Sequence, residues 1–184
     1  MATTPHAYAL TDLDTVKEAL GIVTATDDNL LTRLINAVTD YAERHCGRRF
    51  KDTTYTDELY SGDGDYELIL KQCPLTDTQA VIVKIDDVVV DAADYYTIKP
   101  EGVLHKNSGW ATGIQNIKVT YSAGFAATPS DIEQACIELV GLIYKRAKNA
   151  ELRSETIGSY AVTYADVKAS PFAMDILNFY RKDI

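Results

Sequence analysis

Apolar residues near the N-terminus recur at steps of three and four, as they do on one face of an amphipathic helix. The segment TDDNLLTRLINAVTDYAERHCG keeps this pattern until Gly47, and therefore predicts a helix. Its apolar positions are Leu30, Leu31, Leu34, Ile35, Val38, Tyr41, Ala42 and Cys46. A shorter helix is predicted just before it, within 10–21, with Thr11 or Asp12 as N-cap and Gly21 as the closing residue.

Between Thr53 and Tyr121 the pattern changes to short apolar runs. YELIL, AVIVKI, DVVV, YYTI and NIKVTY are rich in β-branched and aromatic residues, and turn-forming residues separate them. Such runs predict antiparallel β hairpins. Asp86 and Asp87, in the sequence IDDVVV, predict a tight hairpin turn because both tolerate the backbone conformation that such a turn requires.

Helical spacing returns after Pro129. Ser130 and Glu133 have the spacing of a capping box, and Lys145 and Arg146 lie near the end where a helix favours positive charge. The predicted apolar face consists of Ile132, Ala135, Cys136, Leu139, Val140 and Ile143. This segment therefore predicts a further helix of the same bundle.

Two elements are predicted near the C-terminus. The polar stretch KNAELRSETIGS leads into YAVTYAD, which predicts a short β ribbon. The last helix is expected to begin with Ser170 as N-cap and Pro171 at the first helical position. Its apolar positions are Phe172, Ile176, Leu177, Phe179 and Tyr180.

These elements predict an α+β fold. About four helices, from 1–52 and 126–184, should form a small bundle, because each has one apolar face that must be buried. Residues 53–125 are expected to form an inserted antiparallel β segment, and the short ribbon precedes the last helix. The chain of 184 residues is long enough for a hydrophobic core.

The charge of the chain argues against a free-standing nucleic-acid binder. The net charge is -9, and residues 53–125 hold 11 Asp+Glu against 5 Lys+Arg, whereas phosphate binding needs a basic surplus. No apolar run approaches membrane-spanning length, and the start MATTPHAYALTD lacks a signal-peptide pattern, so we expect a soluble protein that is intracellular when made. Cys46, Cys73 and Cys136 are expected to be buried thiols.

The segment VTYSAGFAATPSDI has the strand, glycine and helix order of a phosphate-binding loop but lacks the residues that such a loop needs. Gly124 stands alone with no following lysine, and no three-glycine fingerprint is present. The start of the following helix offers free amides, but the side chains of Ser130 and Glu133 would compete with a phosphate for them, and the acids repel anions. The segment is therefore interpreted as a connector.

The remaining polar residues predict no catalytic, cofactor or metal site. No two of His6, His45 and His105 have ligand spacing, and His45 and Cys46 are adjacent on a helix and so point in different directions. The segment SGDGDYE lacks the spacing of a calcium loop and fits a hairpin tip better. We therefore expect a protein that is not an enzyme.

Two features favour interactions with other proteins. Arg44, Arg48, Arg49 and Lys51 form a dense basic cluster, which either complements a helix dipole and nearby acids or docks an acidic surface of a neighbour. The twelve tyrosines, against four phenylalanines and one tryptophan, suit interfaces as well as half-exposed strands.

The order of several segments resembles the head-tail connector (adaptor, or head completion) family of long-tailed bacteriophages. The segments are LTDLDTVKEALGI, DDNLLTRLINAVTDYAERHCGRRF, GWATGIQNIKVTYSAGFAATPSDIEQACIELVGLIYKR and SETIGSYAVTYAD. The likeness extends from about Leu10 to Tyr180. The middle segment is larger than in the compact, nearly all-helical members.

The resemblance implies a structural protein of the virion, assembled in the bacterial cytoplasm. It implies a homo-oligomeric ring of twelve copies below the portal protein, which extends the DNA channel and offers a docking face to the tail or a stopper protein. DNA would pass without specific binding, and no membrane is involved. The last helix and its tail are then expected to contact the portal or a neighbouring subunit, through Phe172, Phe179, Tyr180, Arg181 and Lys182.

Two alternatives remain open from the sequence. A tail completion or stopper protein could share the same plan, and its position in the particle would distinguish it. A small hydrolytic or ligand-binding domain could use carboxylates of the β segment, and ligand-dependent stabilisation would reveal it.

Overall fold

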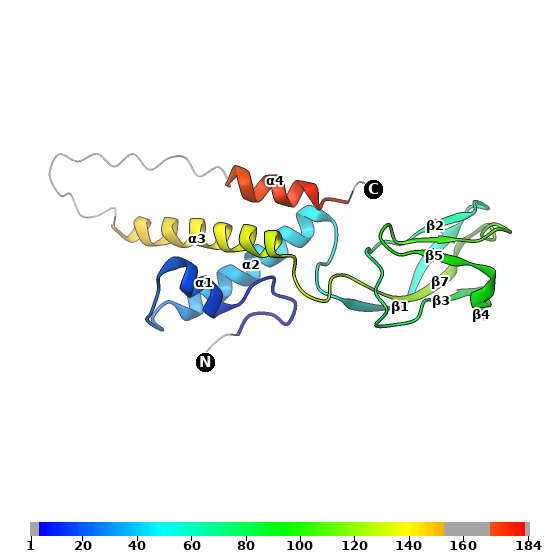
Figure 1. The fold of residues 1–184 in the computed structure, drawn as a ribbon, viewed down its shortest axis with the longest axis horizontal. Coiled ribbons are helices and arrows are strands. Elements are labelled where there is room, and N and C mark those ends of the chain that lie inside the picture. The colour runs from blue at the N-terminus through cyan, green and yellow to red at the C-terminus, as the bar shows by residue number, and fades with distance from the viewer. Residues whose placement is uncertain (1–3, 153–169, 183–184) are drawn as a thin grey trace. The chain divides into compact units, whose positions relative to one another are not determined.

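The computed structural model describes residues 4–152 and 170–182, and its helices and antiparallel sheets confirm the predicted α+β class (Figure 1). The chain forms two compact units. The helical unit comprises Met1–Gly47 and Thr128–Ile184, and the β unit comprises Arg48–Ala127. The predicted ribbon YAVTYAD lies outside the described residues.

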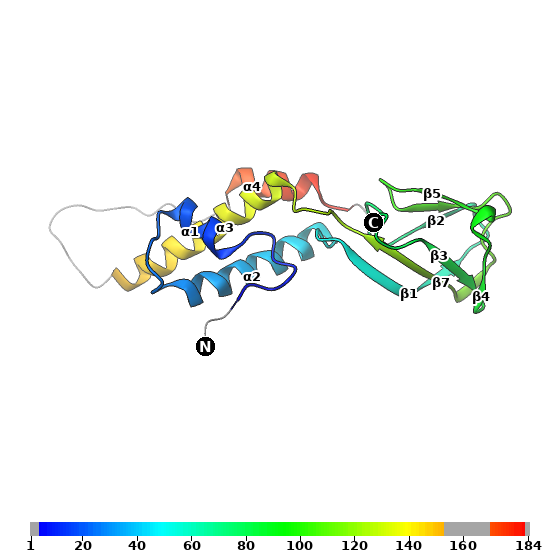
Figure 2. The ribbon, with the colours of Figure 1, turned by 60° about the horizontal axis from the view of Figure 1, so that its bottom comes forward.

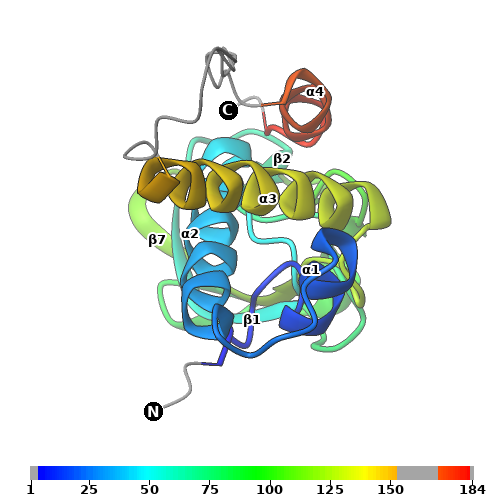
Figure 3. The same ribbon diagram turned by 90° about the vertical axis from the view of Figure 1, so that its left-hand side faces the viewer.

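The helical unit contains α1 (Leu13–Leu20), α2 (Asp28–Cys46), α3 (Ser130–Leu152) and α4 (Pro171–Phe179). Both α1 and α4 pack on α2 and on α3, and α2 packs on α3. Viewed along the bundle, α1 and α4 lie toward one side of the unit and α2 toward the other (Figure 3). The core contains Val16, Leu31, Ile35, Val38, Ile132, Val140 and Leu177, each at most 2% exposed.

Local sequence fixes most helix ends as predicted. The Asp12 carboxylate accepts from the Thr15 N–H at 2.8 Å, and Gly21 adopts the left-handed conformation after α1. Gly47 does the same after α2. Ser170 caps α4, and Pro171 is its first residue, where a missing N–H costs nothing.

The start of α3 differs from the prediction. The Glu133 N–H donates to the carbonyl oxygen of Pro129 at 2.9 Å, so Ser130 is already the first helical residue. Asp131 bonds the amide of Ile132 at 2.9 Å instead. The predicted capping box is therefore wrong, because the helix begins one residue earlier and the backbone carbonyl satisfies the N–H of Glu133.

The β unit is built from two antiparallel sheets in two layers (Figure 2). Its strands are β1 (Thr53–Gly62), β2 (Glu67–Ile69), β3 (Ile82–Ile85), β4 (Val88–Val89), β5 (Tyr96–Ile98), β6 (Val103–His105) and β7 (Gly113–Ala123). One sheet has the order β1-β7-β3-β4 and the other β2-β6-β5. A short 3₁₀ helix, η1 (Ala92–Asp94), precedes β5.

The β3–β4 hairpin confirms the predicted Asp-Asp turn. Asp86 and Asp87 have φ of 48° and 66°, as in the two-residue turn whose twist matches paired strands. Ile85 pairs with Val88 directly across it.

One core fills the space between the two sheets. Leu68 and Leu104 from the three-stranded sheet meet Val83 and Val119 from the four-stranded one. Trp110 is 1% exposed, and its indole N–H donates to the Leu104 carbonyl at 3.2 Å, which satisfies its polar atom inside the core.

The Gly124 segment joins the two ends of the β unit. The Phe125 N–H donates to the Phe50 carbonyl at 2.7 Å, and the Asp52 N–H donates to the Phe125 carbonyl at 3.1 Å. Gly124 has φ of 131°, and a Cβ there would lie 2.6 Å from the carbonyl group of Lys51. The glycine is therefore needed for a close backbone approach, in agreement with the interpretation as a connector.

Replacing Leu177 by alanine should destabilise the helical unit by about 2–5 kcal/mol, because its side chain is fully buried between helices. Urea unfolding followed by circular dichroism measures the change. Phe179→Ala is the matched control, since Phe179 is 82% exposed on the same helix and its loss should change stability by about 0.5 kcal/mol or less. Equal effects of the two variants would contradict the described packing of α4.

Candidate interaction surfaces

Two aromatic side chains lie unburied on α4. Phe172 is 53% exposed and Phe179 is 82% exposed, whereas Ala173 and Leu177 of the same helix are fully buried. The two phenylalanines are seven positions apart, a step of about two helical turns that places them on the same face of the helix. Large exposed aromatic side chains are a feature of protein interfaces.

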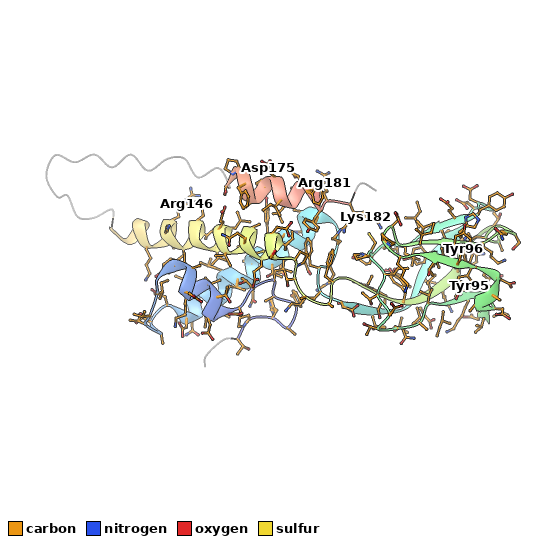
Figure 4. The ribbon with its side chains drawn as sticks, in the orientation of Figure 1. Tyr95, Tyr96, Arg146, Asp175, Arg181 and Lys182 are labelled. Carbon is orange, nitrogen blue, oxygen red and sulfur yellow. The ribbon has the colours of Figure 1, made fainter. Side chains whose placement is uncertain are left out.

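Of the other predicted contact residues, Tyr180 and Lys182 bond to the helical unit, and Arg181 is exposed. The Tyr180 hydroxyl donates to the carboxylate of Asp131, at 3.1 and 3.0 Å from its two oxygens. The Lys182 N–H donates to the Cys46 carbonyl at 2.9 Å. Both residues therefore tie the end of the chain to the helical unit, whereas Arg181 is exposed (Figure 4).

The predicted basic cluster is divided between the units. Arg44 is exposed in the last turn of α2, within the helical unit. Arg48, Arg49 and Lys51 belong to the β unit, where the Arg49 N–H donates to the side-chain oxygen of Gln72 at 3.0 Å. Neither unit by itself holds all four side chains.

A groove of about 300 Å³ lies on α3, between α1 and the start of α4. Its apolar lining consists of Ala19, Leu20, Ile137, Gly141 and Leu142. Gly141 lets α1 approach, since a Cβ there would lie 2.8 Å from the end of Leu20. At the rim, the Ser170 hydroxyl donates to the Glu138 carboxylate at 2.8 Å. Sequence reasoning missed this groove, because its walls come from three distant segments.

The outer face of the four-stranded sheet carries ion pairs beside exposed apolar side chains such as Ile82 and Val89. The Lys84 ammonium lies 2.9 Å from the Asp57 carboxylate, and Lys118 pairs with Asp87. The hydrogen bond from Lys84 lowers the pKa of Asp57, and the hydrogen bond to Asp87 raises the pKa of Lys118. Such exposed pairs fit a face that remains in water.

The outer face of the three-stranded sheet carries stacked aromatic rings. The ring of His105 stacks on Tyr96, with centroids 4.7 Å apart, and on Tyr66 at 6.1 Å. Ile69 on the same sheet is 62% exposed. These residues make a second exposed face with aromatic character, which sequence reasoning anticipated only as a surplus of tyrosine.

A second hollow, of about 510 Å³, lies beside β5 in the β unit. Tyr95, Tyr96 and Lys99 line it, and the Tyr95 hydroxyl donates to the Val81 carbonyl at 2.9 Å. Lys99 pairs with Asp77 at 2.5 Å. No histidine or cysteine is among the residues that line this hollow, and its described polar groups do not form a nucleophile with a base.

A half-buried carboxylate in the β unit, that of Glu58, is held by two phenols. Glu58 accepts from the Tyr121 hydroxyl at 2.6 Å and from the Tyr60 hydroxyl, and the Lys71 N–H donates to Tyr60 at 2.9 Å. Burial raises the pKa of both tyrosines, and the bonds to Glu58 raise it further. Every member has partners inside the fold, so the network stabilises the β unit.

The described residues hold no constellation typical of an enzyme. His45 bonds the side-chain oxygen of Asn178 at 2.8 Å, while the Cys46 thiol donates to the Leu177 carbonyl at 3.2 Å, so they do not form a catalytic pair. Cys46, Cys73 and Cys136 are free and buried, as predicted, and burial raises the pKa of Cys136 to about 12.

The described ranges contain neither a cluster of metal ligands nor a membrane-spanning helix. Within 4–152 and 170–182, no three His, Cys, Asp or Glu side chains gather in a way that could hold a metal ion. No helix in these ranges has the length and apolar character needed to cross a bilayer.

The sequence matches the head completion protein family over residues 9–183. The chain belongs to this family. The resemblance found in its segment order is thereby confirmed, although no curated protein matches the sequence.

Solved structures from gene transfer agent (GTA) particles share the fold of this family member. A chain from "Neck of empty GTA particle computed with C6 symmetry" has a TM-score of 0.65 at 14% identity, and covers 100% of this chain and 95% of its own. A chain from "Neck of native GTA particle computed with C12 symmetry" has a TM-score of 0.57 at 17% identity, covering 100% and 96%. A chain from "Virion of native gene transfer agent (GTA) particle" gives 0.57 at 14% identity, covering 100% and 95%.

The Glu58 network predicts a loss of stability in alkali. A phenol with a raised pKa in the folded state stabilises the fold below the unfolded pKa of about 10, and this contribution falls as pH rises above it. Stability should drop by up to about 1.4 kcal/mol per pH unit for each tyrosine above pH 10. Urea midpoints between pH 8 and pH 11 measure this.

The double variant Tyr60→Phe and Tyr121→Phe should be less stable at pH 8, because Glu58 loses both hydrogen-bond donors. Its free energy of unfolding should also fall less steeply above about pH 10. Tyr66→Phe is the control, since Tyr66 is 59% exposed and should leave both the midpoint and the limb unchanged. If the stability of the double variant fell as steeply above about pH 10 as that of the wild type, the role of these phenols would be contradicted.

Proposed function

We propose that this head completion family member is a ring-forming head-tail connector of a phage-like virion. In this role it binds below the portal protein, extends the channel through which DNA passes, and offers a docking face to a tail or stopper protein. It assembles in the cytoplasm of the bacterial host and acts through shape and self-association, without catalysis.

Family membership over residues 9–183 is the observation that carries the proposal. The structural neighbours support a repeated arrangement, because two of them come from particle necks computed with C6 and C12 symmetry. A chain repeated around one axis needs two different, complementary surfaces, one for each neighbour. The helical unit of this chain has several unburied apolar features from which such surfaces can be formed.

The exposed stripe of α4 is proposed as the contact with the portal or with a neighbouring subunit. Phe172 and Phe179 lie on one face of the helix, and Arg181 follows at its end. Tyr180 and Lys182 act indirectly, because their bonds to Asp131 and Cys46 hold this end of the chain in place. Aromatic side chains are frequent energetic centres of interfaces.

The charge of the chain fits a channel that DNA crosses without being held. A net charge of -9 repels phosphates, so packaged DNA would slide past with no basic groove to bind it. The basic residues Arg44, Arg48, Arg49 and Lys51 are proposed to contact acidic surfaces of neighbouring proteins.

Mixing the protein with its portal protein and imaging by electron microscopy tests the proposal. The expected result is a ring seated on the portal, and label on the chain should lie against the portal. Label at a distance from the portal would favour a stopper or tail completion protein. Absence of both ring and portal binding over a wide concentration range would overturn the proposal.

Replacing both Phe172 and Phe179 by serine should reduce ring formation or portal binding at least about tenfold, because the aromatic contacts that become buried on assembly are lost. Stability should change little, since both side chains are exposed in the free protein. Val23→Ser is the matched control: Val23 is 94% exposed in the helical unit but belongs to the α1–α2 loop. Equal losses for Val23→Ser and the double variant would contradict a specific role of α4.

A further inference from the structure

Two unlike surfaces of the helical unit face in different directions. The groove lined by Leu20, Ile137 and Leu142 lies on α3 between α1 and the start of α4. The exposed side of α2 lies opposite its buried side, which packs against the other three helices. At the edge of this exposed side, the Tyr41 hydroxyl donates to the sulfur of Met174 on α4 at 3.5 Å. In the view along the bundle, α2 lies on the side of the unit opposite α1 and α4 (Figure 3).

The outer stripe of α2 is defined here as Arg33, Leu34, Ala37, Tyr41 and Arg44. Steps of three and four residues join these positions, so they lie along one side of the helix. Arg33, Ala37 and Arg44 are exposed, Leu34 is half-buried and Tyr41 is 39% exposed. The stripe therefore presents an apolar centre between two arginines.

The groove has the shape and chemistry to receive a helix of this kind. Its volume of about 300 Å³ has an apolar floor, and it runs along α3 with α1 as one wall. Leu20 stays at the surface of this wall, since Gly141 brings α1 close to α3 without burying it fully. An amphipathic helix lying in an apolar groove is a common mode of recognition.

Carboxylates on the helices that flank the groove are complementary to the arginines of the stripe, although the groove lining also includes Lys145. Neither Arg33 nor Arg44 forms an ion pair with another residue that the structure describes. Glu18 on α1 and Asp175 on α4 are exposed, and they too have no ion-pair partner within 4–152 and 170–182 (Figure 4). The helices that flank the groove thus offer carboxylates for which the stripe offers guanidinium groups.

We propose that the outer stripe of α2 from a second copy of this chain occupies the groove between α1 and α4. The inference rests on the proposed ring and specifies its repeated contact. Because groove and stripe are different surfaces on opposite sides of one unit, the contact leaves a free groove on one copy and a free stripe on the other. Each added copy repeats the contact, and a suitable rotation closes the ring.

Site-directed disulfide formation tests the contact in the full chain. Ala37→Cys places a thiol on the stripe, and Gln134→Cys places one on the exposed rim of the groove. The three natural cysteines are buried, so the new thiols should react selectively. In rings assembled on the portal, the double variant should yield a ladder of covalent oligomers after mild oxidation, and each single variant should remain monomeric.

The controls separate this inference from the ring itself. The matched control combines Gln134→Cys with Thr24→Cys in place of Ala37→Cys. Thr24 is exposed on the α1–α2 loop, so this variant should give no ladder of covalent oligomers. Rings without a ladder in the A37C/Q134C variant would overturn the contact and leave the connector role standing. Covalent dimers from either single variant would indicate a two-fold contact and also overturn it.

Two further outcomes of the same experiment count against the contact. A groove thiol that is protected from maleimide in the monomer would show that another part of the same chain fills the groove. Failure of the wild type to form rings with the portal would overturn both the contact and the proposed function.

Charge reversal gives an independent test. The double variant R33E/R44E should reduce the yield of rings at least tenfold, because glutamates on the stripe would then face Glu18 and Asp175. Arg146→Glu is the matched control, since Arg146 is exposed on α3 but does not line the groove, and it should assemble normally (Figure 4). Normal assembly of R33E/R44E, or equal loss with Arg146→Glu, would contradict the contact.

Discussion

The pairing of β1 with β7 is the constraint on which the two-unit architecture depends. The chain leaves the helical unit after α2 and returns to it at α3, so the inserted segment must begin and end at neighbouring points. Antiparallel pairing of Thr53 with Ala123 meets this condition, and the bonds between Phe50, Asp52 and Phe125 extend it. The stacked rings of Phe50 and Phe125, with centroids 6.4 Å apart, add an apolar contact at the same place. Each unit can therefore complete its own core.

Both units carry ion pairs and exposed apolar side chains at their surfaces. In the β unit, Asp57 and Asp87 pair with lysines on the outer sheet face, and the half-buried Glu58 accepts from Tyr60 and Tyr121. In the helical unit, several charges at the surface of α1, α2 and α4 remain without an ion-pair partner among the described residues, and apolar side chains lie exposed near them. Exposed apolar side chains beside unpaired charges are typical of surfaces that bind other proteins.

Sequence reasoning succeeded where the determining contacts are local. Asp12 as N-cap, Gly21 and Gly47 as closing residues, and the turn at Asp86 and Asp87 all follow from the conformations that single residues favour. The predicted start of α3 was wrong by one residue, because the backbone carbonyl of Pro129 accepts the hydrogen bond that was assigned to the side-chain cap.

The features that the sequence did not reveal depend on partners far apart in the chain. The groove needs Leu20 against Gly141, and the half-burial of Tyr180 needs its bond to Asp131. Strand order is of the same kind: β3 pairs with β7 and not with its predecessor, β2, a choice made by the shared core of Val83 and Val119.

The burial of all three thiols makes the fold indifferent to redox conditions. Cys46, Cys73 and Cys136 form no cross-link, and Cys136 has too high a pKa to supply thiolate near neutral pH. Reducing agents have no disulfide among these cysteines to break, and mild oxidants meet no exposed thiol. The three cysteines should therefore keep the same covalent state in reducing and in mildly oxidising surroundings.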